Sequence, residues 1–290
     1  MSPIAGAPGE RAGIRPGDLI VGIDGHDTAP LTMEQAVRLL RGPTGSAVRL
    51  DIERGPSHDK VSIGALREPI HIMTVRREAL TPQVAALRLS QFGTYTPEDL
   101  DKQVKEILRA APTPPDALLV DLRANPGGIL DIVVQVAGAF STDDTVVAHQ
   151  VSRQGQVLLS AAATKPPHPA LSTDARDWLR RVRIAVLVDA GTASGAEALA
   201  LFLRDRRGAR IFGARTFGLA RVGQIFTIGD AASIRVQTNE LRSSRGIPWE
   251  GVGIVPDLLV PAVPPGGRMP EFGSAGDAVF AMALRSLQTP

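Results

Sequence analysis

The stretch that decides the fold is Ile184–Gln224, which reads IAVLVDAGTASGAEALALFLRDRRGARIFGARTFGLARVGQ. Its first residues, Ile184–Val188, are all apolar, which predicts a buried strand. The chain then turns through Gly191, and the apolar residues of Ala198–Leu203 predict a helix that begins near Ser194. A strand, a tight turn and a helix in succession predict an α/β core.

Ser194 has two interpretations, and the residues alone leave both open. At the start of a helix the backbone N–H groups have no partner within the helix, and the helix dipole is positive there. A serine in that place can act as a nucleophile beside a site that stabilises an oxyanion. Alternatively, Thr192 or Ser194 is simply the N-cap of the helix, a position where serine and threonine are common.

The composition predicts a globular protein and argues against several classes of site. The 290 residues are 43% hydrophobic and 21% charged, and this length allows one or two domains with a sizeable core. The formal net charge is only +2 and no basic stripe is present, so we expect no nucleic-acid binding. Without cysteine, disulfides and thiolate metal sites are excluded. The longest apolar runs are too short to predict a transmembrane segment, and the first residues do not predict an export signal.

The N-terminal segment predicts a small β-rich domain. Ala12–Gly25 reads AGIRPGDLIVGIDG, in which a Pro-Gly-Asp turn precedes a strand over Leu19–Ile23. Thr32 is placed to cap a helix over Met33–Leu40, and Ala47–Arg54 alternates apolar and polar residues as a strand does. The run Arg-Ala-Gly-Ile-Arg-Pro-Gly-Asp resembles the PDZ domains of bacterial proteases.

We expect this PDZ-like domain to cover residues 1–68, with a linker over Arg54–Pro69 and a second domain over residues 69–290. The first residues, Ser2-Pro3-Ile4, resemble the middle of a PDZ domain, so the domain is expected to be truncated at its N-terminus. The loop that binds a peptide carboxylate in such domains would then be missing. In the second domain, Ile70–Val75 and Val84–Leu89 are predicted to be strands, and Asp277–Leu287 a closing helix.

A second notable motif follows the predicted strand Ala117–Leu122. It reads Arg-Ala-Asn-Pro-Gly-Gly and ends at Gly127 and Gly128, after which Ile129–Phe140 has a helical pattern. Glycines after a strand let backbone N–H groups point into a cleft without a side chain in the way. The alternative is an ordinary turn between a strand and a helix.

Four motifs resemble those of the C-terminal processing peptidases, also called tail-specific proteases. They are DLRANPGG (121–128), GTASGAEALALFLRD (191–205), GARTFG (213–218) and GVGIVPD (251–257). The resemblance implies that Ser194 is the nucleophile. It also implies that the N–H of Gly195 and an N–H of Gly127 or Gly128 form the oxyanion hole, and that Gln224 corresponds to a glutamine that orients the base.

The family's general base is missing from its expected position. In the family a lysine directly follows the Thr-Phe-Gly motif, twenty-five residues after the nucleophile, and that position is Leu219 here. One residue is also inserted before Gln224 relative to the family pattern. None of the five histidines has a spacing that places it near Ser194. A serine hydroxyl is a poor nucleophile unless a base takes its proton, so the resemblance leaves the activity open.

The resemblance predicts a serine-type endopeptidase that cuts protein tails through Ser194, with a base supplied from elsewhere, as in relatives that use histidine. The alternative is a catalytically weak or inactive pseudo-peptidase that binds peptides or partner proteins. A defective copy without a stable function is a third interpretation.

The predicted fold class is mixed α/β, with a partial PDZ-like β-rich module followed by an α/β serine-peptidase core. The resemblance implies no cofactor and no metal. It implies protein or peptide substrates, recognised through apolar C-terminal tails, and a location in the bacterial cell envelope or periplasm.

Overall fold

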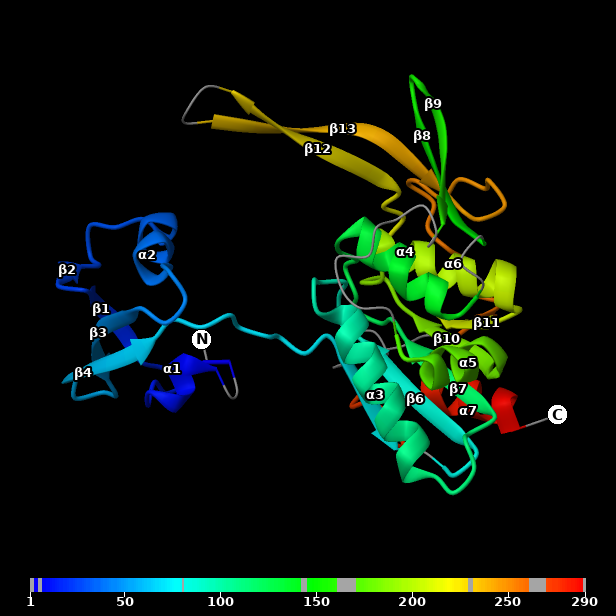
Figure 1. The fold of residues 1–290 in the computed structure, drawn as a ribbon, viewed down its shortest axis with the longest axis horizontal. Coiled ribbons are helices and arrows are strands. Elements are labelled where there is room, and N and C mark those ends of the chain that lie inside the picture. Colours follow the sequence, from blue (N-terminus) through cyan, green and yellow to red (C-terminus); the bar gives the residue numbers. More distant parts are fainter. Residues whose placement is uncertain are drawn as a thin grey trace. The chain divides into compact units, whose positions relative to one another are not determined.

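The computed structural model describes residues 3–4, 7–79, 81–141, 145–160, 171–228, 232–260 and 270–288. The chain divides into two compact units, Met1–Ile72 and Met73–Pro290, which are blue to cyan and cyan to red in Figure 1. The predicted boundary, between residues 68 and 69, lies in the last part of the first unit.

The N-terminal unit is a four-stranded antiparallel sheet with two helices. Its elements are α1 (Pro8–Arg11), β1 (Leu19–Ile23), β2 (His26–Asp27), α2 (Met33–Leu40), β3 (Ala47–Arg54) and β4 (Asp59–Leu66), and the strand order is β2-β1-β3-β4. Helix α2 begins where predicted, because the Thr32 hydroxyl accepts the backbone N–H of Gln35. The small core contains Ile23, Leu50 and Ile52.

The predicted linker over Arg54–Pro69 is wrong, because strand β4 occupies most of it. Residues from Asp59 to Leu66 pair antiparallel with β3. Gly55 and His58 both adopt a positive φ, so the Gly-Pro-Ser segment forms a hairpin turn instead of a linker. The alternation of Val61, Ile63 and Ala65 was the signal for a strand with one buried face.

The core unit is built on a six-stranded sheet. Its strands are β5 (Val75–Ala79), β6 (Val84–Leu89), β7 (Ala117–Asp121), β10 (Arg183–Val188), β11 (Arg210–Gly213) and β14 (Leu258–Leu259), in the order β14-β11-β10-β7-β6-β5. All neighbours are parallel except β5, which runs antiparallel to β6 at one edge. The predicted strand Ile70–Val75 is wrong, because β5 begins at Val75 and the N–H of Thr74 is bonded to the Asp99 carboxylate.

Helices cover both faces of this sheet. They are α3 (Thr96–Ala110), α4 (Leu130–Ala139), α5 (Thr173–Arg181), α6 (Gly195–Arg207) and α7 (Ala278–Gln288), and Figure 1 shows them around the central strands. Leu118 and Val120 share one apolar cluster with α3–α6, whereas Leu119 shares another with α7. Because both faces are buried, the central strands β7 and β10 are nearly continuous apolar runs. The observed fold therefore agrees with the predicted mixed α/β class.

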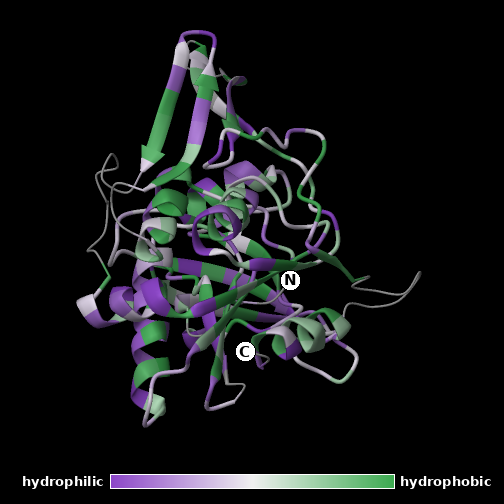
Figure 2. Ribbon diagram, turned by 90° about the vertical axis from the view of Figure 1, so that its right-hand side faces the viewer, coloured by the Kyte–Doolittle hydropathy of each residue, from purple (hydrophilic) through white to green (hydrophobic). Residues whose placement is uncertain are grey.

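Two hairpins form a second sheet, in the order β12-β13-β8-β9. They are β8 (Val146–Ser152) with β9 (Gly155–Ser160), and β12 (Arg221–Ile228) with β13 (Ala232–Arg242). Both hairpins extend away from the helices in Figure 1. Hydrophobic segments continue out along β8 and β9 in Figure 2, where Val157 and Leu158 are exposed.

Candidate active site

The segment between β10 and α6 is a tight turn fixed by two buried side chains. The Asp189 carboxylate accepts the N–H groups of Gly191 and Ala124, each at 2.9 Å. The Thr192 hydroxyl donates to the Leu122 carbonyl at 2.8 Å, and Thr192 is fully buried. Thr192 is therefore not the N-cap of α6. It ties this turn to the segment that follows β7.

Ser194 is the residue that precedes α6, as the sequence predicts. Its φ is +55°, a left-handed conformation that costs a non-glycine residue about 1–3 kcal/mol and persists only where the surroundings impose it. Ser194 is half-buried, whereas the α6 residues Gly195–Leu203 are buried. A strained turn between a strand and a helix is also how serine hydrolases of other folds present a nucleophile.

The turn before α6 lies directly against the Gly127-Gly128 segment. A Cβ atom added to Gly127, whose φ is +94°, would lie 2.8 Å from the Gly195 nitrogen and 2.9 Å from Ser194 Cβ. A Cβ atom added to Gly195 would lie 3.7 Å from the Gly128 nitrogen. The structure thus brings Ser194, Gly195, Gly127 and Gly128 together. Their meeting follows from topology, because β7 and β10 are parallel neighbours and their carboxyl ends share one edge of the sheet.

Asn125 distinguishes between the two glycines. Its side-chain oxygen accepts the Gly127 N–H at 2.8 Å, its amide donates to the Leu89 carbonyl at 2.9 Å, and its backbone carbonyl accepts the Ala193 N–H. The Gly127 N–H is therefore occupied. The N–H groups of Gly128 and Gly195 donate to no acceptor within the described part of the chain, so both donors remain available close to Ser194.

A buried carboxylate joins this turn to the segment Thr216–Leu219. Glu197 is fully buried, and one of its oxygens accepts the N–H groups of Ser194 and Leu219, each at 2.9 Å. The other oxygen accepts the Thr216 hydroxyl at 2.5 Å and the Gly218 N–H at 2.8 Å. Each oxygen thus serves two donors. The bond shared between Ser194 and Leu219 places position 219 beside the candidate nucleophile.

The motif GVGIVPD (251–257) supports the same segment from its other side. The Thr216 hydroxyl accepts the Ile254 N–H at 2.7 Å, and the Gly218 carbonyl accepts the Gly251 N–H at 2.8 Å. The sequence indicated that Glu197 helps to start a helix. It did not show that this residue fixes Thr216–Leu219, because that contact joins elements about twenty residues apart.

The described residues bring no histidine or lysine into hydrogen-bonding contact with Ser194. His26 and His58 make their bonds within the N-terminal unit, and His149 contacts the Ser244 carbonyl. His168 lies outside the described residues. Gln224 pairs with Val236 in the β12–β13 hairpin, but its side chain is also outside what is described, so its proposed role stays a prediction.

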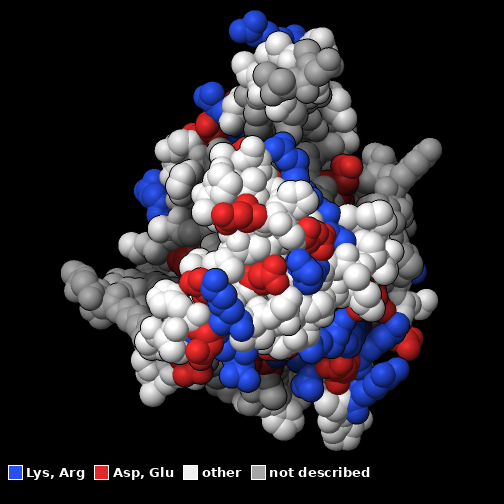
Figure 3. All heavy atoms as spheres, turned by 90° about the vertical axis from the view of Figure 1, so that its left-hand side faces the viewer, with Lys and Arg blue, Asp and Glu red and all other residues white. Residues whose placement is uncertain are grey.

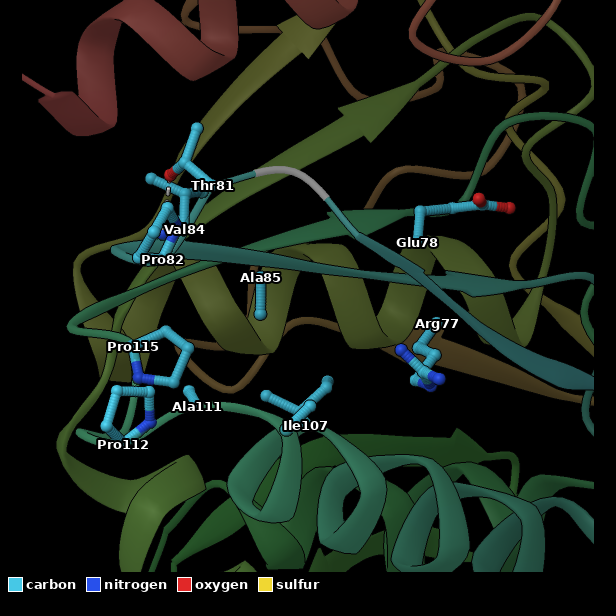
Figure 4. A pocket seen from close by; sticks show the side chains of 11 residues that line it. Arg77, Glu78, Thr81, Pro82, Val84, Ala85, Ile107, Ala111, Pro112 and Pro115 are labelled. Atoms are coloured by element: carbon cyan, nitrogen blue, oxygen red, sulfur yellow. Dashed lines mark hydrogen bonds between the residues drawn. The ribbon is translucent and has the colours of Figure 1, made fainter.

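One cavity lies away from this turn. Figure 4 shows a cavity of about 310 Å³ between β5, β6 and the end of α3, where Ala85, Ile107 and Pro115 form apolar walls. None of its lining residues belongs to the turn before α6 or to the glycine segment. In the described parts of the chain, no cluster of three acidic or histidine side chains is arranged to hold a metal ion. The helices described there are too short or too polar to cross a membrane.

The chain matches two family models. Residues 83–260 match peptidase family S41, and residues 1–54 match the PDZ domain. The carboxy-terminal-processing protease of Bartonella bacilliformis is 32% identical over 263 residues, which are 90% of this chain and 57% of that protein. The carboxyl-terminal-processing protease of a Picosynechococcus species is 32% identical over 286 residues, 97% of this chain and 64% of that protein. The chain thus spans about three fifths of the length of these two relatives.

Solved structures have the same fold. The photosystem II D1 C-terminal processing protease superimposes with a TM-score of 0.55 at 25% identity, over 95% of this chain and 72% of that one. An S41 protease fold from Bacteroides fragilis superimposes with a TM-score of 0.58 over 98% of this chain and 76% of that one. Its identity is 16%, so this second likeness concerns the fold alone.

Proposed function

Because the chain belongs to the C-terminal processing group of peptidase family S41, with a PDZ domain at residues 1–54, we propose that it is a slow serine-type peptidase of protein tails. Ser194 is the nucleophile in this proposal. The observation that carries it is that the backbone N–H groups of Ser194 and Leu219 share one oxygen of Glu197. In this proposal Leu219 stands where the family has its base.

Each residue of the site has a role in this chemistry. The Ser194 hydroxyl oxygen attacks the carbonyl carbon of the scissile peptide bond. The negative charge that develops on the carbonyl oxygen is stabilised by the N–H groups of Gly195 and Gly128, which come from two different elements. The geometry favours Gly128 over Gly127 because Asn125 already accepts the Gly127 N–H.

Leu219 limits the rate because it cannot accept the proton of the serine hydroxyl. General base assistance contributes about 10²–10⁴-fold to such reactions. The carboxylate of Glu197 does not replace the lysine, since each of its oxygens already accepts two hydrogen bonds. Hydrolysis then proceeds with water as the proton acceptor, supported by the two backbone donors.

A pseudo-peptidase is the second candidate, and the leucine itself favours it. An apolar residue beside the nucleophile turn keeps the site suited to apolar peptide segments while removing the group needed for turnover. Both candidates bind peptides or protein tails with apolar C-termini and need no cofactor. Figure 3 shows basic and acidic side chains together on the face that it draws, and the expectation that nucleic acid is not a partner rests on the net charge of +2. The proposed location in the bacterial cell envelope rests on the family resemblance.

A cleavage and binding assay on three proteins tests the proposal. The wild type, Ser194→Ala and Leu219→Lys are incubated with a fluorescent peptide that has an apolar free C-terminus, and binding is measured by anisotropy. Slow cleavage by the wild type that disappears in Ser194→Ala supports the slow peptidase. Binding without cleavage in all three proteins supports the pseudo-peptidase. Rapid wild-type cleavage that depends on Ser194 would show that another group acts as the base.

A further inference from the structure

The glycine segment beside Ser194 has a second anchor besides Asn125. Arg123 is only 4% exposed, and its guanidinium donates from Nε and Nη2 to the Asp121 carboxylate at 2.9 and 3.0 Å. From Nη1 and Nη2 it also donates to the Asp277 carboxylate at 2.8 and 2.9 Å. Two carboxylates therefore hold one planar group bidentately, which fixes its orientation as well as its position.

Asp277 connects this arginine to the C-terminal helix. Its carboxylate also accepts the Phe280 N–H at 3.1 Å, in the first turn of α7, and the Gly273 N–H at 3.3 Å. The Phe272 ring lies 5.7 Å from the Arg123 guanidinium carbon. Asp277 is fully buried, so this contact is shielded from solvent. The start of α7 is thus bonded to a residue 154 positions earlier, at the end of β7.

Arg123 does not need Asp277 to neutralise its charge. Asp121 alone would neutralise the guanidinium, and it lies only two residues away on the same strand end. A second buried carboxylate adds a net negative charge to the interior, which is costly unless it is well paired. Burial lowers the pKa of the Arg123 guanidinium, but the hydrogen bonds that it donates to Asp121 and Asp277 outweigh burial and raise this pKa above its usual value.

The backbone between this anchor and the glycines is strained. Ala124 follows Arg123 directly and has a φ of +56°. A left-handed alanine persists only where its surroundings hold it. The Asp189 carboxylate accepts the Ala124 N–H, and the bonded residues Arg123 and Asn125 flank it on either side. If Arg123 were free to turn, one of these three supports would be lost, and Gly127-Gly128 would move relative to Ser194.

We propose that Asp277 is a positioning residue for the candidate active site: through Arg123 it holds the strained Ala124 turn, and so sets the Gly128 N–H opposite Ser194. This inference rests on the proposed function, because it concerns the oxyanion donors of that site. It assigns to α7 a role in the chemistry, although α7 packs on the face of the sheet opposite to α6.

The test measures how fast Ser194 is acylated by p-nitrophenyl acetate. In this step a bond forms between the serine oxygen and the acetyl carbon, the bond to p-nitrophenolate breaks, and the serine proton passes to water. Because p-nitrophenolate is a good leaving group, it needs no general acid, and water takes the serine proton in every variant alike. Differences in rate between the variants therefore report on the oxyanion donors. Asp277→Asn keeps the size of the side chain but loses its charge and one acceptor.

We expect Asp277→Asn to lower the rate constant of the nitrophenolate burst at least tenfold, with its amplitude still one per chain. Leu287→Ala is the matched control, because Leu287 is a buried residue of α7 that does not contact Arg123. It should lower the melting temperature of the protein without slowing the burst. If Asp277→Asn is not folded at the assay temperature, Arg123→Lys takes its place, since one ammonium group cannot bind both carboxylates bidentately.

Three other results overturn the inference. A wild-type burst rate in folded Asp277→Asn or Arg123→Lys would show that the contact is only structural. Equal slowing in Leu287→Ala would show that any loosening of α7 is sufficient and that Asp277 has no specific role. A full burst in Ser194→Ala would instead reject the proposed nucleophile, and with it the site that Asp277 is proposed to position, so the two failures are distinguishable.

Discussion

Glu197→Gln exchanges one carboxylate oxygen for an amide group, and the structure predicts a large effect on the stability of the core unit. The two oxygens of Glu197 accept four hydrogen bonds, from Ser194, Thr216, Gly218 and Leu219. Glutamine keeps one acceptor oxygen and points two N–H groups at donors. The Thr216 hydroxyl can rotate to accept one of these N–H groups. The least unfavourable orientation of the glutamine therefore places its NH2 group next to Thr216, where it still faces the N–H of Gly218.

The magnitude follows from these contacts. One hydrogen bond to a charged group contributes about 1.5–3 kcal/mol, and the remaining bonds weaken when the charge is removed. We therefore expect Glu197→Gln to lower the free energy of unfolding by about 2–4 kcal/mol. Urea unfolding followed by tryptophan emission measures this in the core unit, because both tryptophans, Trp178 and Trp249, lie there.

Glu240→Gln is the control for this experiment. The Glu240 carboxylate is 37% exposed, and among the described residues it accepts a hydrogen bond only from the Arg242 side chain, at 3.2 Å. An exposed pair of this kind contributes at most about 1 kcal/mol. If Glu197→Gln and Glu240→Gln lower the free energy of unfolding equally, the interpretation of Glu197 as the joint between the two site segments is refuted.

Three further changes test other parts of the structure. Gly127→Ala should lower the free energy of unfolding by more than about 2 kcal/mol and abolish ester acylation, because its Cβ would lie 2.8 Å from a backbone nitrogen. Gly155→Ala is the control: its φ is also positive but no atom lies within 4 Å, so it should lower the free energy of unfolding less in the same urea assay. Arg207→Met should cost about 2–4 kcal/mol in thermal unfolding, since three backbone carbonyls lose the hydrogen bonds that the half-buried guanidinium donates to them. The hydrogen bond from Arg54 lowers the pKa of Asp18 from 3.8 to about 2, so the ionised carboxylate stabilises the folded state fully above pH 3.8 and loses this effect as the pH falls towards 2. Asp18→Asn should remove this acid dependence of stability, measured by circular dichroism, and an unchanged acid profile would contradict the assignment.

Most of the fold could be predicted because each buried strand is bounded by turn residues. The apolar runs of β7 and β10, and the alternation of apolar and polar residues in β3, correctly predicted these strands. Helix α2 begins after the predicted cap, Thr32. Two predictions were wrong. The Gly-Pro-Ser turn before β4 was interpreted as part of a linker, and the apolar run before β5 was predicted to be a strand although it pairs with no other strand among the described residues. Ile70–Met73 looks like a strand, but the adjoining Thr74 N–H is bonded to a carboxylate of α3.

The candidate site could be predicted only in part, because sequence gives residue types and order but not long-range hydrogen bonds. The motifs placed Ser194 at the start of α6 and Gly127-Gly128 after β7. They could not choose between the glycines, since the choice depends on which N–H Asn125 occupies. They also could not show that Glu197 accepts the N–H of Leu219. A Glu at the third position of a helix predicts only where that helix begins, which is local information.

In the proposed function Leu219 stands in place of the family's base, and its backbone contacts explain how the site would keep its shape. Its position is fixed by its backbone N–H, which donates to Glu197, and the neighbouring Gly218 N–H does the same. Neither bond involves the side chain at 219, so exchanging lysine for leucine removes a proton acceptor without removing a support of the fold. Burying an amine costs free energy that burying leucine does not. Leu219→Lys should therefore raise the rate of peptide cleavage and lower the melting temperature at once. A variant that gains stability without gaining activity would mean that the side chain at 219 points away from Ser194, and Leu219 would no longer account for slow turnover.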